Sequence, residues 1–183
     1  MDIEIITVKN ILLVEDDPQD VELTLKALGE HGLARRVAVV DNGAEAVDYL
    51  YRRGKFETRA AGNPMVVLLD NKMPQLDGLE VLKTIKADER LKTIPVVVLT
   101  SSDETRDLID FYEHGANAYV IKPVDYSEFM TTVKRLGVFW ADVNEPPPTT
   151  WGEETGGQNG GGDHQGRKEF EDGTPASHPA LGG

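Results

Sequence analysis

Residues 65–70 read Met-Val-Val-Leu-Leu-Asp, an apolar run that ends in a carboxylate. A short, continuous apolar run of this kind is typical of a strand buried on both faces, as in a parallel sheet. The carboxyl ends of such strands form the edge at which open α/β sheets bind their ligands. The stretch therefore predicts a buried parallel strand, with Asp70 at the ligand-binding edge of the sheet.

Three other apolar runs lead into polar residues in the same way. They are residues 11–14 before Glu15, Asp16 and Asp17, residues 96–99 before Thr100 and Ser101, and residues 119–121 before Lys122 and Pro123. If these strands are parallel, then several acids, a hydroxyl group and a lysine gather at one edge of one sheet. Carboxylate oxygens are the ligands that Mg²⁺ prefers, so the pattern indicates a metal-assisted site for phosphoryl chemistry.

Strand-like and helix-like segments alternate from about residue 9 to about residue 143. Residues 36–40 predict a further strand, and each strand is followed by apolar residues at helical spacing. The predicted helices are residues 18–28, 43–50, 79–85, 103–114 and 125–136, and residues 52–64 have no periodicity and predict a long loop. Five such βα units predict an α/β fold with a doubly wound, five-stranded parallel sheet.

Composition excludes several classes of function. The net charge of −13, from 32 acidic and 19 basic residues, argues against binding to nucleic acid or to an anionic membrane surface. The chain has no cysteine, which excludes disulfides and thiolate chemistry. No apolar stretch approaches the length of roughly 18–20 residues that a membrane span needs. We therefore expect a soluble, cytoplasmic protein.

The character of the sequence changes near residue 144. Residues 8–143 carry the alternating pattern and predict one domain, whereas residues 144–183 are rich in Gly, Pro and acids. A segment with so few aliphatic residues buries too little apolar surface to offset the entropy of ordering. It predicts a disordered C-terminal tail.

Several fragments, taken in order, point to a known family. They are Val14-Glu15-Asp16, Leu68-Leu69-Asp70 with Met73-Pro74 and Asp77-Gly78, Leu99-Thr100-Ser101, and Tyr119-Val120-Ile121-Lys122-Pro123. Their combination resembles the receiver domain of two-component response regulators. Residues 15–18, the long loop, and the endings at 136–140 and 144–147 look like the stand-alone receivers associated with bacterial phytochromes.

The resemblance implies a flavodoxin-like (βα)5 fold and a single-domain response regulator. Such a protein accepts a phosphoryl group from a sensor histidine kinase, here of the bacteriophytochrome kind, in a reaction that depends on Mg²⁺. It catalyses its own phosphorylation and dephosphorylation and is not an enzyme in the usual sense.

The resemblance also assigns roles to residues. Asp70 would be the phosphoacceptor, with Glu15, Asp16, Asp70 and the backbone carbonyl of Lys72 as the ligands of Mg²⁺. Lys122 and Thr100 would be catalytic, Thr100 and Tyr119 would form the switch, and Pro123 would follow a cis peptide bond. Sliding the acidic run by one residue instead gives Asp16 and Asp17 as the metal pair. We prefer Glu15 and Asp16, because Asp17 before Pro18 suits a helix cap.

The side chain of Lys72 borders the path of an attacking water in this family. We hypothesise that it slows hydrolysis of the acyl phosphate.

The family usually signals through the face formed by its fourth helix, fifth strand and fifth helix, here residues 103–114, 119–121 and 125–136. Phytochrome-associated receivers suggest a homodimer through this face. Phe139 and Trp140 either close the core or serve dimerisation, and the sequence leaves both readings open.

Two other functions compete with this interpretation. One is a protein-docking module that works without phosphorylation. The other is a Mg²⁺-dependent aspartyl-phosphate hydrolase, but such enzymes usually carry a second acid two residues after the nucleophile, where this chain has Lys72.

Overall fold

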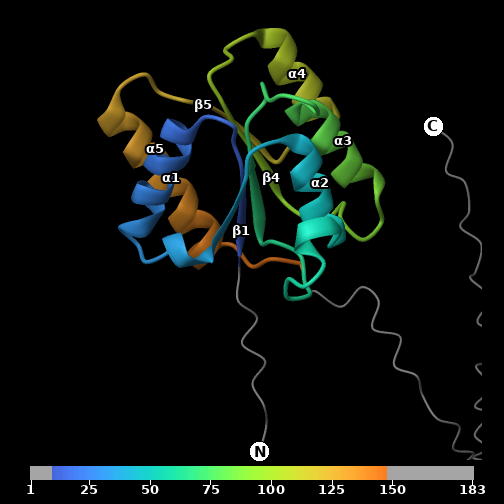
Figure 1. Ribbon diagram of the computed structural model, residues 1–183. Helices are drawn as coiled ribbons and strands as arrows, with labels where there is room; N and C mark the ends of the chain where they lie inside the picture. Colours follow the sequence, from blue (N-terminus) through green and yellow to red (C-terminus); the bar gives the residue numbers. More distant parts are fainter. Residues whose placement is uncertain (1–9, 148–183) are drawn as a thin grey trace, which may run out of the picture. The chain divides into compact units, whose positions relative to one another are not determined.

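The computed structural model describes residues 10–147, so the predicted tail at 144–183 lies outside the described residues from position 148 onward. Five strands and five α-helices alternate along this part of the chain (Figure 1). Their bounds are β1 Ile11–Val14, α1 Pro18–Gly29, β2 Val37–Val40, α2 Gly43–Tyr51, β3 Val66–Leu69, α3 Gly78–Ala87, β4 Val96–Thr100, α4 Thr105–Glu113, β5 Ala118–Ile121 and α5 Tyr126–Val138. Short helical turns occupy η1 Ala34–Arg36, η2 Gly54–Phe56 and η3 Phe139–Val143.

The strands form one parallel sheet in the order β2-β1-β3-β4-β5. Because the chain reverses its direction of winding after the first two strands, β1 and β3 lie side by side while their connections leave in opposite directions. Ligands of open α/β sheets bind at this switch point, beyond the carboxyl ends of the strands. The predicted doubly wound, flavodoxin-like fold is confirmed.

Alternate residues of each central strand point into two separate cores, as the two-residue period of a strand requires. Leu12, Val14, Val67 and Leu69 pack with apolar residues of α2, α3 and α4. Ile11, Leu13, Val66 and Leu68 face the other way and pack with α1 and α5. Figure 1 shows the same division, with α1 and α5 on one side of the sheet and α2 and α3 on the other.

The end of α5 decides between the two readings of its aromatic pair. The helix widens into the π-helical turn η3, where Trp140 is buried against the α1–α5 core and Phe139 stays 47% exposed. Trp140 therefore closes the core, and Phe139 remains available at the surface.

The predicted loop at 52–64 contains the short turn η2, in which Phe56 packs edge-on against Tyr49 with ring centroids 5.3 Å apart. The Arg59 guanidinium lies over the Tyr49 ring, 4.3 Å from its centroid. An aromatic contact therefore anchors this loop, although the loop sequence shows no hydrophobic periodicity that would predict the contact. Within residues 10–147, no helix is long and apolar enough to cross a membrane.

Candidate functional site

Asp70 follows β3 directly and lies at the switch point. Its backbone N–H donates to the carbonyl of Val14 at 3.0 Å, which continues the pairing with β1 by one residue. The side chain is mostly buried, and this burial raises its pKa, although the positive charge of Lys122 opposes the shift. The backbone beyond it is crowded, because a Cβ on Gly78 would lie 2.3 Å from the Asp70 carbonyl oxygen.

The acidic residues after β1 have two different roles. Asp17 is the N-cap of α1, where its side chain accepts a hydrogen bond from the Gln19 backbone N–H at 2.7 Å. Carboxylate oxygens of Glu15, Asp16 and Asp70 lie within 4.8 Å of one another. The predicted cap is therefore confirmed, and the geometry favours Glu15 and Asp16 over the shifted pair.

These three carboxylates suit a hard divalent cation. Mg²⁺ takes oxygen ligands in octahedral geometry and retains several waters, so one or two carboxylates together with solvent are a usual protein contribution. Glu15 is 3% exposed and Asp16 is exposed, so the cluster has one buried and one open side. Burial raises the pKa of Glu15 to about 7, against the hydrogen bond and charge of Lys122. A cation placed among these oxygens would relieve the cost of burying their negative charge.

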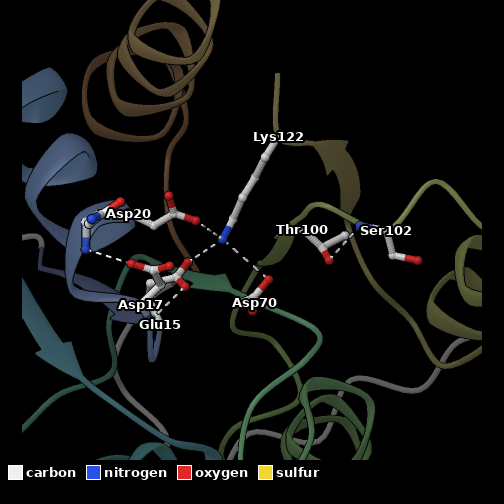
Figure 2. A network of polar contacts seen from close by, with 8 residues as sticks. Glu15, Asp17, Asp20, Asp70, Thr100, Ser102 and Lys122 are labelled. Atoms are coloured by element: carbon white, nitrogen blue, oxygen red, sulfur yellow. Dashed lines mark hydrogen bonds and ion pairs between the residues drawn. The ribbon is translucent and has the colours of Figure 1, made fainter. Parts of the chain in front are cut away.

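Lys122 brings a positive charge to the cluster from the end of β5. Its Nζ lies 2.6 Å from Glu15 Oε2, 2.7 Å from Asp20 Oδ2 and 3.5 Å from Asp70 Oδ1 (Figure 2). Burial alone lowers the pKa of an ammonium group, but here the hydrogen bonds to Asp20 and Glu15 and the charge of Asp70 raise the pKa of Lys122 above its usual value. The lysine is thus held in its charged form beside the carboxylate of Asp70.

Asp20 was not predicted as part of the site. It lies in the first turn of α1, three residues after the cap Asp17, and it contacts Lys122 across 102 positions of sequence. One feature of the sequence could have indicated this role: Asp20 lies in the first turn of a predicted helix that begins at the site. Figure 2 shows that it approaches the ammonium from the α1 side.

Thr100 and Tyr119 lie on the other flank of Asp70 and are joined through Ser102. The Ser102 backbone N–H donates to Thr100 Oγ1 at 3.2 Å, and the Tyr119 hydroxyl donates to the Ser102 carbonyl at 3.1 Å. Thr100 is buried, and the Tyr119 ring packs against Phe111 of α4 with centroids 5.7 Å apart. One loop after β4 therefore connects both of the predicted switch residues.

Comparison with known proteins agrees with this geometry. Residues 11–134 match the model of the response regulator receiver domain. The chain belongs to this family.

Among relatives of this receiver, the probable methanogenesis regulatory protein FilR2 of Methanothrix harundinacea is 39% identical over 137 residues, which are 75% of this chain and 86% of that protein. Response regulator Rcp1 of Synechocystis is 35% identical over 135 residues, 74% of this chain and 90% of the relative.

Solved structures are similar as well. The phosphorylated cyanobacterial phytochrome response regulator RcpA has a TM-score of 0.72 at 36% identity, over 76% of this chain and 99% of that one. The bacteriophytochrome response regulator RtBRR has a TM-score of 0.62 at 53% identity, over 77% of this chain and 85% of that one.

One expectation from the family resemblance is wrong. Between residues 10 and 147 every peptide bond is trans, including the bond between Lys122 and Pro123. The trans form of an X-Pro bond is favoured by about 0.5–1 kcal/mol. In this receiver the trans backbone already carries the Lys122 ammonium to within 3.5 Å of Asp70, so the site is assembled without a cis bond.

Proposed function

We propose that this receiver domain is a response regulator that takes a phosphoryl group from a histidine kinase onto Asp70. The observation that carries the proposal is the convergence of an ammonium and three carboxylates beyond the carboxyl ends of β1, β3 and β5. The ammonium belongs to Lys122, and the carboxylates are those of Glu15, Asp16 and Asp70. A receiver is not a classical enzyme, because its own side chain is the acceptor.

In the proposed step an oxygen of the Asp70 carboxylate attacks phosphorus while the bond from phosphorus to the kinase histidine nitrogen breaks. The electron pair of that bond stays with the imidazole, and Asp70 becomes an acyl phosphate. During transfer the negative charge of the phosphoryl group is spread over its three equatorial oxygens. The Lys122 ammonium, 3.5 Å from Asp70 Oδ1, lies where it can balance that charge.

Glu15, Asp16 and Asp70 would hold Mg²⁺, together with the backbone carbonyl of Lys72. With Mg²⁺ bound, the repulsion between an anionic nucleophile and an anionic phosphoryl group is reduced. The acidic cluster supports this assignment. So does a relative of known structure, the Mn²⁺-bound form of Rcp1, which is 34% identical with a TM-score of 0.72, over 76% of this chain and 99% of that one.

Thr100 and Tyr119 would report the new phosphate to the surface. A hydroxyl drawn toward the phosphoryl oxygens leaves its bond with the Ser102 N–H, and the loop that also binds Tyr119 follows. The nearby surface offers Ile109, Tyr112 and Ile121, which are 47–49% exposed. This apolar face supports contact with a protein partner or with a second copy of the chain.

The proposed kinase is of the bacteriophytochrome class. The support is the likeness to RtBRR and to the bacteriophytochrome response regulator AtBRR, each at 53% identity. The net charge of −13 favours protein partners over nucleic acid. The cytoplasmic location expected from the sequence stays a prediction.

The proposal is tested by incubating the full chain with acetyl phosphate in Mg²⁺ or in EDTA and then treating it with hydroxylamine. An acyl phosphate is cleaved by hydroxylamine to leave a hydroxamate on Asp70, which peptide mass spectrometry locates. We expect the hydroxamate only in Mg²⁺ and only in the peptide that contains Asp70. Continuous phosphate release without any trapped acyl phosphate would favour the hydrolase, and neither product would favour the phosphorylation-independent docking module.

A further inference from the structure

Helix α4 is held to the rest of the domain by little apolar contact. Phe111 is its one buried side chain, and all nine residues of α4 are in the described part of the chain. By contrast, α3 buries Gly78, Val81, Leu82 and Ile85. Elements with few buried apolar contacts open most readily, so polar contacts account for a larger share of the attachment of α4.

Asp107, in the first turn of α4, supplies such a contact. Its Oδ2 accepts two hydrogen bonds, from Asn71 Nδ2 at 3.0 Å and from Ser102 Oγ at 2.7 Å. The two donors belong to different loops, since Asn71 follows β3 and Ser102 follows β4. The N-cap residue Glu104 makes no capping bond with its side chain among the residues that the structure describes. A single carboxylate oxygen therefore ties the start of α4 to both loops.

Each loop leads directly to a residue of the phosphorylation site. Asn71 is the neighbour of Asp70 in the chain, and it is only 9% exposed. Ser102 binds Thr100 through its N–H and Tyr119 through its carbonyl. Figure 2 shows Thr100 and Ser102 joined on the flank of Asp70 opposite the Lys122–Asp20 contact. Asp107 therefore contacts both Asn71, which follows the acceptor Asp70 in the chain, and Ser102, which is hydrogen-bonded to the switch residues.

We propose that Asp107 is a positioning residue that couples the phosphorylation state of Asp70 to the attachment of α4. This inference rests on the proposed function. When the Thr100 hydroxyl turns toward the phosphate, Ser102 loses its N–H bond to Thr100 and shifts. The bond between Ser102 and Asp107 is then lost or weakened, and the N-terminal turn of α4 loosens. The outer surface of α4, with Leu108, Ile109 and Tyr112 exposed, changes its dynamics as a result.

The test is hydrogen exchange of α4, followed by mass spectrometry on the full chain. The samples are the native protein, Asp107→Ala and the matched control Asp110→Ala, each with Mg²⁺ and with or without acetyl phosphate. Asp110 is on the same helix, and its ion pair with Arg106, at 4.0 Å, is too long and too exposed to stabilise much. Intact mass of the same samples reports how much phosphate each one carries.

Without phosphate, we expect amides 104–113 to exchange about tenfold faster in Asp107→Ala than in the native chain, because two hydrogen bonds to a charged group are lost. Asp110→Ala should match the native chain. With phosphate, exchange in the native chain should rise toward the rate of the variant, while Asp107→Ala should change by less than twofold. Ser102→Ala removes the bond from Ser102 to Asp107 and the long 3.5 Å bond from the Glu104 N–H to Ser102 Oγ, but it keeps the bond between Asn71 and Asp107. It should also raise the resting rate, and it serves as the second variant if Asp107→Ala is poorly folded.

A resting exchange rate in Asp107→Ala and Ser102→Ala equal to that of Asp110→Ala would overturn the proposal. A full response to phosphate in Asp107→Ala would also overturn it. The resting comparison needs no phosphate, so it judges the role of Asp107 by itself. Absence of any phosphate on the native chain would instead show that the proposed function is wrong.

Discussion

Replacing Asp70 by Asn should stabilise the metal-free protein. Burial raises the pKa of Asp70, so at neutral or higher pH its ionised form is disfavoured in the folded state. Its oxygens lie within 4.8 Å of those of Glu15 and Asp16. At an effective dielectric constant of about 20, a pair of like charges at that distance repels by about 3.5 kcal/mol, so the two pairs that Asp70 forms with Glu15 and Asp16 together repel by about 7 kcal/mol. The exposed position of Asp16 lowers its share through screening.

Lys122 offsets most of this repulsion. At 3.5 Å from Asp70 Oδ1, its attraction is about 5 kcal/mol on the same scale. The substitution removes both the repulsion and the attraction, and Lys122 keeps Glu15 and Asp20 as partners. The balance favours Asp70→Asn by about 1–2 kcal/mol, which corresponds to a melting temperature higher by about 3–6 °C.

Magnesium should reverse this order. A ligand present at a hundred times its dissociation constant stabilises the folded state by about 2.7 kcal/mol. The native chain has all three carboxylates and should gain this amount, whereas Asp70→Asn lacks one and should gain much less. The native chain then becomes the more stable of the two.

The assay is thermal and urea unfolding, followed by circular dichroism, in EDTA and in saturating MgCl₂. It is run at pH 8, above the pKa of about 7 that burial gives Glu15, so that the cluster is ionised. Asp142→Asn, an exposed site in η3, is the charge-matched control and should follow the native chain. A variant less stable than the native chain in EDTA, or an equal gain from Mg²⁺ in both proteins, would refute the reasoning.

Three further substitutions test other parts of the site. Lys72→Asn should shorten the lifetime of the acyl phosphate severalfold if the exposed lysine hinders the attacking water, and an unchanged decay in a phosphate-release assay would remove that role. Gly78→Ala should cost at least about 2 kcal/mol in urea unfolding, because the new Cβ would lie 2.3 Å from the Asp70 carbonyl oxygen; wild-type stability would show that the loop yields easily. Asp17→Ala should cost about 1 kcal/mol through the lost helix cap while leaving Mg²⁺ affinity nearly unchanged, whereas a large loss of affinity would make Asp17 a metal ligand after all.

The sequence was sufficient for the strands and for the edge at which they present polar residues. Asp70 and Lys122 follow apolar runs whose strand character depends on local composition, and parallel strands necessarily end at the same edge. The acidic run was ambiguous by one residue until Pro18 identified Asp17 as the cap. The local rules of helix N-capping predicted that cap correctly.

The sequence did not predict the roles of Asp20 and Asp107, because these roles depend on contacts between distant parts of the chain. Each is an acid in the first turn of a helix, where such residues are common for reasons of the helix dipole. Only the fold, which brings the first turn of α1 to the residue after β5 and the first turn of α4 to two loops, places them beside Lys122, Asn71 and Ser102.

Two other points were outside the reach of sequence patterns. The isomer of an X-Pro bond is decided by less than about 1 kcal/mol of intrinsic preference, so the bond before Pro123 depends on its surroundings. Phe139 and Trp140 are adjacent apolar residues at the end of a helical pattern. The wider π-helical turn determines which one enters the core.

The central claim is that Asp70 is a phosphoacceptor whose reaction depends on the acidic cluster and on Lys122. The most direct measurement is the intact mass of the native chain and of Asp70→Asn after incubation with acetyl phosphate, with Mg²⁺ and with EDTA. We expect one added phosphoryl group on the native chain in Mg²⁺ and none in EDTA or on the variant. An equal mass gain on Asp70→Asn, or a gain that persists in EDTA, would contradict the account.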